Sequence, residues 1–473
     1  MYDPKSKDAN EFICHEEIEE SLAQARSQAN DPAVIKQILD KAGQFKGLTH
    51  REAAVLLNVE DPDLLEDVYK LARQVKEHIY GRRIVMFAPL YLSDYCVNKC
   101  TYCGYNHDHC FGRHKLNHDE LVREVKLLEG MGHKRLALET GEDPVNSPIE
   151  YVLDCIKTIY SLKFDNGAIR RVNVNIAATT VENYRKLKDA GIGTYVLFQE
   201  TYHKPTYLGV HPAGPKRNYE YHTEAHDRAM DGGIDDVGLG VLFGLYDWKY
   251  ETVGLLMHAE HLDTAKGVGP HTFSTCRIRK AEGVNAKDFP HLVSDEDFKK
   301  IVAVLRLATP YTGMILSTRE PKGYRDDVIA VGISQVSAGS RTGVGGYAHA
   351  AKLGFEDEVP QFEPEDHRSP NEMLKDLMED GYIPSYCTAC YRKGRTGDRF
   401  MKLAKTGEIQ NMCQPNAILT LQEYLLDYGN DELRELGKKV IEKELAAIPK
   451  AKVREVTEEY LAKIRAGERD FRI

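Results

Sequence analysis

The sequence lacks any long apolar segment and any excess of basic charge. No apolar run approaches the ~18 residues that cross a membrane, and the longest candidate, Val237–Tyr246, contains three glycines. The first residues, Met1–Glu20, are charged and show no apolar signal segment. The 63 basic and 73 acidic side chains give a net charge of −10, which argues against binding to nucleic acid or anionic membranes by bulk charge. These absences predict a cytoplasmic protein with neither nucleic acid nor membrane as a partner.

Cysteine, in contrast, is plentiful. Ten cysteines occur among the 473 residues, and thiols stay reduced in the cytoplasm. They therefore require a metal or catalytic explanation before a disulfide one. Apolar residues make up 42% of the chain and charged residues 29%, which is the composition of a soluble globular protein with an ordinary core.

Start signals for helices are frequent near the N-terminus. Asp31-Pro32 and Asp61-Pro62 each place a capping residue before a proline at the first helical position. Thr49 and Glu52 match a capping box. Residues 1–82 are therefore predicted to form a helical extension.

From residue 83 to residue 340, short apolar runs alternate with amphipathic helices. This alternation predicts an α/β fold, a (β/α)8 TIM-type barrel. Residues 341–473 are expected to form a third, mostly helical domain, after a surface linker at Glu356–Pro370. The expected barrel strands are Ile84–Pro89, Arg135–Glu139, Val172–Ala177, Thr194–Gln199, Val237–Phe243, His271–Thr275, Met314–Ser317 and Ile333–Val336.

Cys96, Cys100 and Cys103 form a C-x3-C-x2-C motif just after the first predicted strand. Three thiolates can hold three irons of a 4Fe–4S cubane and leave the fourth iron without a protein ligand. That open iron can bind the amino and carboxylate groups of S-adenosyl-L-methionine (SAM), whose reductive cleavage gives a 5′-deoxyadenosyl radical. The alternative is a structural zinc site with a fourth ligand from a histidine or cysteine nearby, at His107, His109 or Cys110.

This motif, with Tyr102 between its last two cysteines, resembles the signature of the radical SAM superfamily. Gly141-Glu142-Asp143, after the second strand, resembles the glycine-rich motif of that superfamily. The resemblance implies that Tyr102, Gly141, Glu142 and Asp143 bind the cofactor. Without it, the second motif could equally be a glycine turn with acidic caps.

Several polar residues are predicted to face the barrel lumen. Asn173 and Asn175 alternate with apolar residues in the third strand, so both amides point inward, toward a polar ligand or toward one another. Glu200 ends the fourth strand, and barrel enzymes hold active-site residues at such ends. We expect Asn173, Asn175 and Glu200 to contact the cofactor, and Asn175 and Glu200 to be catalytic as well.

Arg319 follows the seventh predicted strand. Its guanidinium could hold an amino-acid carboxylate, or it could form an ion pair with Glu320 or another neighbour. The run Ser317-Thr318-Arg319-Glu320 resembles the aromatic amino-acid lyase branch of the radical SAM superfamily. That resemblance implies that Arg319 is catalytic and that the substrate is L-tyrosine, cleaved to p-cresol and dehydroglycine.

Cys387, Cys390 and Cys413 form a second motif, C-x2-C-x22-C. The last histidine is His367, so no downstream histidine completes a Cys3His zinc site, although a distant ligand could. A second open 4Fe–4S cluster in the C-terminal domain is the better interpretation.

Three further segments resemble the FeFe-hydrogenase maturases of the tyrosine lyase branch. The resemblance implies that the second cluster, with an extra iron bound by His271, converts dehydroglycine to CO and cyanide for the hydrogenase H-cluster. It also implies a reductant protein and other hydrogenase maturases as partners, and it leaves free L-cysteine open as a further ligand of the iron. One departure is Cys276, where the family usually has a proline, and it bears on how His271 is aimed. The segments are Arg171–Thr180, Gly193–Tyr202 and Cys387–Met401.

Two other functions stay open on the sequence. One is a tyrosine lyase, 2-iminoacetate synthase, which stops at dehydroglycine for thiamine thiazole synthesis. The other is a non-catalytic binding protein stabilised by zinc. About eight irons per chain, rather than one or two zincs, would exclude the binding protein.

Overall fold

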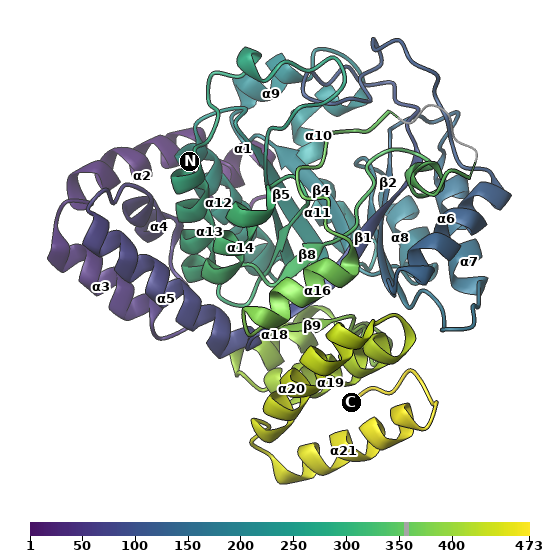
Figure 1. The fold of residues 1–473 in the computed structure, drawn as a ribbon. Helices are drawn as coiled ribbons and strands as arrows, with labels where there is room; N and C mark the ends of the chain where they lie inside the picture. Colours follow the sequence, from purple (N-terminus) through teal and green to yellow (C-terminus); the bar gives the residue numbers. More distant parts are fainter. Residues whose placement is uncertain (354–358) are drawn as a thin grey trace.

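The computed structural model describes residues 1–353 and 359–473. An N-terminal group of helices packs against one side of a barrel, and a C-terminal group lies below it (Figure 1). The predicted helix starts are present: Asp31 and Asp61 cap helices that begin with proline, and Thr49 forms the capping box with Glu52. The N-terminal helices are α1 Ala9–Phe12, α2 His15–Gln28, α3 Pro32–Ala42, α4 His50–Leu57 and α5 Pro62–Tyr80.

Eight parallel strands close into the predicted barrel, because β1 pairs with both β2 and β8. All eight predicted strands form, and the largest difference is at β1, which runs to Ser93 instead of Pro89. Every residue of β5 is buried, as expected for a strand covered on both faces. The strands are β1 Arg83–Ser93, β2 Arg135–Thr140, β3 Arg171–Asn175, β4 Tyr195–Glu200, β5 Val237–Phe243, β6 Thr272–Arg277, β7 Gly313–Leu316 and β8 Gln335–Ser337.

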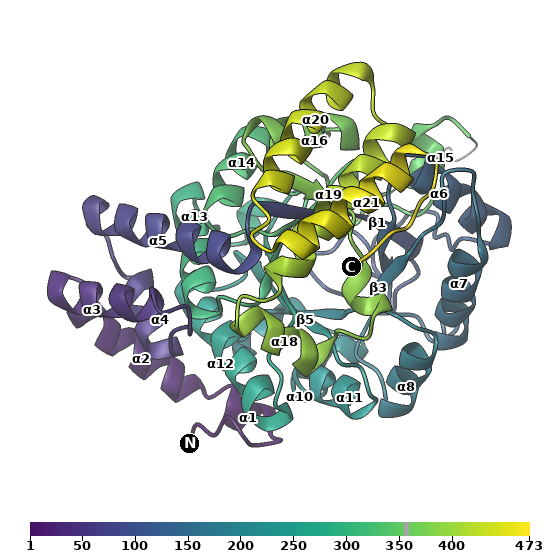
Figure 2. The same ribbon diagram turned by 90° about the horizontal axis from the view of Figure 1, so that it is seen from below.

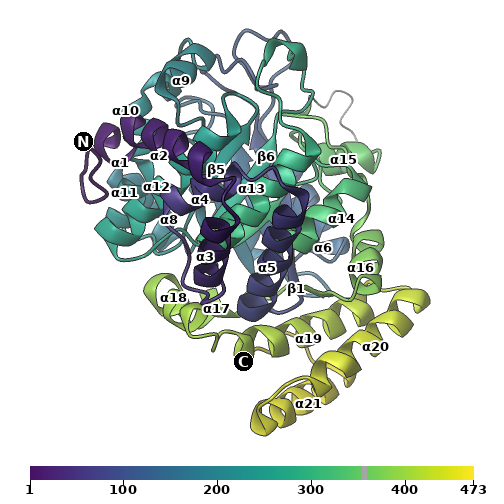
Figure 3. The ribbon, with the colours of Figure 1, turned by 90° about the vertical axis from the view of Figure 1, so that its left-hand side faces the viewer.

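Helices cover the outside of the barrel. The helices α4 and α5 of the N-terminal extension pack on α12 and α13, so the extension adds a second layer there (Figure 3). The barrel region contains α6 His118–Gly130, α7 Ile149–Ser161, α8 Val181–Asp189, α9 Lys204–Val210, η1 Pro215–Arg217, α10 Tyr219–Thr223, α11 Ala225–Asp231, α12 Trp248–Lys266, η2 Ala286–Asp288, α13 Asp295–Ala308, α14 Lys322–Val331 and α15 Gly346–Ala350.

The C-terminal region contains one strand that the sequence did not predict. Strand β9 pairs in parallel with the start of β1, with Arg83 opposite Ile383. This pairing holds the C-terminal helices across the amino-terminal opening of the barrel (Figure 2). The elements are α16 Pro370–Glu379, β9 Ile383–Ser385, α17 Ala389–Arg392, α18 Gly397–Lys405, α19 Gln410–Asp427, α20 Asp431–Ala446 and α21 Ala451–Arg465.

The predicted surface linker was wrong where the structure describes it. Its first residues, 356–358, lie outside the described residues. The following residues cross the carboxyl end of the barrel. There the backbone amide of Gln361 donates a hydrogen bond to the Thr342 carbonyl, and the side chain of Phe362 is buried. Asp366 is also buried, and its carboxylate forms an ion pair with the buried Arg325. Charge and proline content did not reveal these buried partners. The boundary at residue 340 stays a prediction.

No helix among the described residues is long and apolar enough to cross a membrane.

Candidate functional site

The first cysteine trio lines a cavity at the carboxyl end of the barrel, the cluster cavity, together with Tyr102 and Gly141. Burial raises the pKa of Cys100 well above its usual value, and it raises the pKa of Cys103 to about 11. Thiols in such a place stay protonated unless a cation compensates the thiolate charge. Iron would supply that compensation, so the donor set fits a cluster.

Gly141 fixes the loop that carries these cysteines. A Cβ atom at this position would lie 2.3 Å from the carbonyl oxygen of Tyr95, so only glycine allows the approach. The neighbouring Glu142 accepts a hydrogen bond from the Val97 backbone amide at 2.8 Å and one from Asn98 Nδ2 at 2.6 Å. The motif therefore binds the cysteine loop directly.

Asp143 has a different position from its two neighbours. Its carboxylate accepts hydrogen bonds from the backbone amides of Val145 and Asn146, and it does not line the cluster cavity. The structure thus brings Gly141 and Glu142 to the cavity, whereas Asp143 caps its own turn. Its predicted contact with the cofactor stays a prediction.

Glu200 and Tyr102 also line the cluster cavity. Glu200 has a φ of +68°, a strained backbone for a residue with a side chain, and such strain is typical of functional sites. Its carboxylate accepts a hydrogen bond from Lys216 Nζ at 2.7 Å. Burial opposes the charge on Lys216, but the Glu200 carboxylate and the thiolate form of Cys100 outweigh it and raise the pKa of this amine. The Tyr102 hydroxyl lies 2.8 Å from Nε2 of His211.

A second cavity, the central cavity, extends into the barrel below Arg319. The guanidinium of Arg319 stacks on the Phe362 ring, 3.5 Å from its centroid. Glu320 does not pair with it, because its carboxylate binds Arg277 and Arg279 instead. Within the described residues Arg319 therefore has no carboxylate partner, which leaves its charge for a ligand.

The two lumen asparagines both line the central cavity, at different depths. Asn173 Oδ1 accepts the Thr194 backbone amide at 3.1 Å, so part of this amide serves the structure. Asn175 lies higher, lines both cavities and hydrogen-bonds Glu139. Asn175 is thus the asparagine that reaches the cluster cavity.

The second trio lines a cavity at the opposite end of the barrel, the lower cavity. Cys387 follows β9, Cys390 lies in α17 and Cys413 lies in the first turn of α19. A hydrogen bond between Cys390 and Cys413 lowers the pKa of Cys413. Arg83 faces all three cysteines. Burial opposes its charge, but the thiolate forms of these cysteines outweigh burial and raise the pKa of Arg83.

His271 lines the lower cavity, immediately before β6. Its Nε2 atom lies 3.0 Å from the Tyr391 hydroxyl, and burial lowers its pKa, so it is a neutral imidazole able to bind metal. Cys276 lies at the other end of β6, where it lines the cluster and central cavities. The structure thus separates Cys276 from His271 by most of the length of β6.

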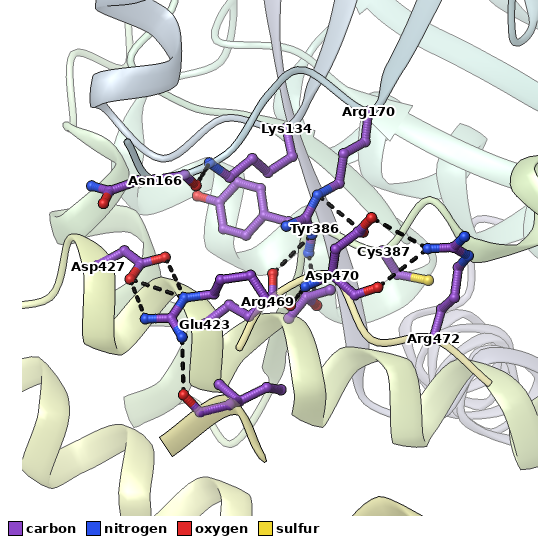
Figure 4. A network of polar contacts seen from close by, with 12 residues as sticks. Lys134, Asn166, Arg170, Tyr386, Cys387, Glu423, Asp427, Arg469, Asp470 and Arg472 are labelled. Carbon is purple, nitrogen blue, oxygen red and sulfur yellow. Dashed lines mark hydrogen bonds and ion pairs between the residues drawn. The ribbon is translucent and has the colours of Figure 1, made fainter. Parts of the chain in front are cut away.

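A polar network fixes the C-terminal region beneath the barrel, and Figure 4 shows it beside Cys387. Arg170 Nη1 donates to Glu423 at 2.8 Å, and its Nε lies 3.3 Å from Asp470. Arg469 pairs with Asp427. These ion pairs connect the loop before β3 with α19 and the last residues of the chain, so the second trio has a rigid support.

The three cavities follow one another along the barrel lumen. Gln335 lines both the central cavity and the lower cavity. The cluster and central cavities share Glu139, Asn175, Phe198, Cys276, Arg319 and Gln361. The two cysteine trios therefore lie at opposite ends of one series of cavities.

No three His, Cys, Asp or Glu side chains in the described residues converge closely enough to hold a single metal ion. Each trio instead lines the wall of a cavity, which suits a larger cluster.

Two family models match the chain. The model of the radical SAM superfamily matches residues 90–259, and the model of the biotin and thiamin synthesis associated domain matches residues 274–383. The barrel and the trio at its carboxyl end are thus those of a radical SAM enzyme, a class that uses a 4Fe–4S cluster and SAM.

Similar proteins narrow the class. A solved structure of HydG, a maturase of the FeFe-hydrogenase, is 60% identical with a TM-score of 0.94 and covers 98% of this chain and 100% of that one. HydG from Carboxydothermus hydrogenoformans is 38% identical with a TM-score of 0.82 and covers 96% and 99%. The 2-iminoacetate synthase of Salmonella typhimurium is 30% identical over 73% of this chain and 89% of that protein. The chain belongs to the HydG family.

Several cavity residues were not predicted from the sequence. Glu139, Lys216 and Gln361 line the upper cavities. Arg83 and Arg135 line the lower one. Both arginines begin barrel strands, but a charge at a strand end is common, so no signal in the sequence distinguished them.

Proposed function

We propose that the protein is a radical SAM carbon–carbon lyase that cleaves L-tyrosine to p-cresol and dehydroglycine. It then converts dehydroglycine to CO and cyanide, bound to iron, for assembly of the FeFe-hydrogenase H-cluster. The observation that carries this proposal is the pair of cysteine trios at opposite ends of one barrel lumen. Two metal centres that share a lumen suit a reaction with two successive steps.

In the cluster cavity, Cys96, Cys100 and Cys103 would hold the first 4Fe–4S cluster. Gly141 and Glu142 would bind SAM through the backbone and carboxylate at the cavity wall. When the cluster is reduced, the cluster and SAM together supply a 5′-deoxyadenosyl radical. The lumen walls exclude water from the reacting groups.

In the central cavity, Arg319 would bind the carboxylate of tyrosine by two parallel hydrogen bonds. Its stacking on Phe362 holds the guanidinium plane in position. Asn175 and Glu200, at the ends of neighbouring strands, would orient the amino acid and the cofactor. The serine and threonine side chains of this cavity offer partners for the phenol.

In the lower cavity, Cys387, Cys390 and Cys413 would hold the auxiliary 4Fe–4S cluster, and His271 would bind the extra iron. The positive charge of Arg83 would offset the negative charge of three thiolates. We also propose free L-cysteine as a further ligand of that iron, a reductant protein and other hydrogenase maturases as partners, and the cytoplasm as the location.

The alternative, a 2-iminoacetate synthase that stops at dehydroglycine, agrees less well with the comparisons. The synthase from Salmonella typhimurium matches 73% of this chain, whereas the first HydG structure matches 98%. More than a quarter of the chain is therefore unmatched in the synthase.

Cysteine variants of each trio test the proposal. In Cys96→Ala we expect no p-cresol from tyrosine, because the radical chemistry requires the first cluster. In Cys387→Ala we expect p-cresol to form while CO falls to background. Cys110→Ala is the matched control, since this thiol is exposed. Wild-type p-cresol in the first variant, or an unchanged CO yield in the second, would refute the corresponding assignment.

A further inference from the structure

Glu139 lies where the cluster cavity meets the central cavity, and it lines both. Glu139 is the last residue but one of β2, where it is in register with Tyr91 of β1 and Asn175 of β3. Of the described residues that line the central cavity, Glu139 is the one acidic residue and Arg319 is the one basic residue. A cavity with one acid and one base suits a ligand that carries one group of each sign.

The cluster cavity also contains the charged groups Glu142, Glu200 and Lys216, but Arg319 is the one charged side chain that acts on the pKa of Glu139. Burial raises the pKa of Glu139 to about 8, and a hydrogen bond from Asn175 and the charge of Arg319 only partly oppose this effect. Burial also raises the pKa of Tyr91 and that of Cys276, so both stay neutral. The carboxyl is thus the one group at this junction that changes its charge near neutral pH.

The proposed reaction needs such a group. A free amino acid is an ammonium carboxylate in water, whereas a hydrogen atom is removed most readily from the nitrogen of a neutral amine. Arg319 accounts for the carboxylate, and the amino group must then lie at the junction with the cluster cavity. The uncharged and acidic polar groups at that place are Glu139, Asn175 and Gln361. Gln361 Oε1 already accepts the Tyr91 hydroxyl at 2.9 Å, which leaves Glu139 and Asn175 to bind the amino group.

We propose that the carboxyl of Glu139 binds the α-amino group of tyrosine and shares a single proton with it. The transfer breaks one N–H bond of the ammonium and forms one O–H bond on the carboxylate, and nothing is oxidised or reduced. The amine is then neutral when it meets the radical. This inference rests on the proposed function and adds a catalytic residue to it.

Proton exchange on binding tests the inference without turnover. At pH 7 the carboxyl of unliganded Glu139 is mostly protonated, and tyrosine arrives with a protonated amino group. The bound pair keeps only one of these two protons, so binding releases about one proton to the buffer. At pH 8.5 most Glu139 is ionised, and the release falls to about zero. Calorimetric titration of the reconstituted enzyme with tyrosine, in buffers of different ionisation enthalpy, measures this number. A proton number that is the same at both pH values would overturn the inference.

Variants test the catalytic consequence. In Glu139→Gln we expect p-cresol formation at pH 7.5 to fall about a hundredfold, the lower end of general-base effects, and to recover at least about tenfold by pH 9. Glu139→Asp should keep activity within about tenfold of wild type. Glu150→Gln is the control, because this glutamate is exposed on α7. A wild-type rate in Glu139→Gln at pH 7.5 would overturn the inference.

The two proposals fail in different ways. If the wild-type enzyme forms no p-cresol from tyrosine, the proposed function is wrong. If it forms p-cresol but its proton number does not depend on pH, only the role of Glu139 is wrong.

Discussion

Substitution of Gly141 by alanine tests whether the glycine-rich motif fixes the first cysteine loop. The new Cβ atom would lie 2.3 Å from the Tyr95 carbonyl oxygen and 3.1 Å from Cys96 Cβ. Ordinary contact begins near 3.4 Å, so the loop must move by about 1 Å. Misplacement of that size costs about a hundredfold in rate when reacting groups are displaced, and here it displaces a cluster ligand as well.

The assay has two parts. Iron analysis of the reconstituted Gly141→Ala variant should give about five irons per chain instead of about nine, counting the extra iron, because only the first cluster is lost. Production of p-cresol should fall at least about a hundredfold. Gly112→Ala is the matched control, since a Cβ at Gly112 meets nothing within 4 Å. Full iron content together with a wild-type rate in Gly141→Ala would refute the reasoning.

Two further predictions concern ion pairs. Arg319→Gln should raise the KM for tyrosine about ten- to hundredfold, because a charge-assisted hydrogen bond contributes about 1.5–3 kcal/mol; an unchanged KM in steady-state p-cresol assays would contradict this role. Asp366 binds the buried Arg325 at 2.7 Å and Arg368 at 2.6 Å, so Asp366→Asn should lower the free energy of unfolding by about 3–5 kcal/mol. Burial opposes its charge, but Arg368 and Arg325 lower its pKa to about 2. Its stabilisation is therefore present above about pH 4 and is lost as the pH falls toward 2; denaturant midpoints equal to wild type at pH 7 would contradict this prediction.

The barrel could be predicted because local sequence determines most of it. Strand β5 reads as a continuous apolar run bounded by turns, and Val237–Phe243 matches the structure at both ends. The two cysteine trios stood out for another reason, because their spacing indicates metal chemistry, and the structure brings each trio to the wall of one cavity.

The remaining features depend on contacts between distant residues. Strand β9 contains Pro384 and spans Ile383–Ser385; it forms because the start of β1 offers an unpaired edge. The segment after residue 358 looked like a linker, but Phe362 and Asp366 find partners on Arg319 and Arg325. Local patterns contain no information about such partners.

The same limit applied to individual site residues. The sequence could not show whether Arg319 pairs with Glu320, its neighbour in the chain. In the structure Glu320 binds Arg277 instead, which lies 43 residues away. Glu139 was missed because its role depends on the neighbours that the barrel brings to it across two strands.

Electron paramagnetic resonance of the reduced, anaerobically reconstituted protein, with and without SAM, tests the two-centre account most directly. We expect two distinct 4Fe–4S signals, of which SAM changes only the one that is absent from Cys96→Ala. The other should persist in that variant and disappear in Cys387→Ala. A single cluster signal in the wild-type protein, or two signals that are both unchanged by SAM, would contradict the account.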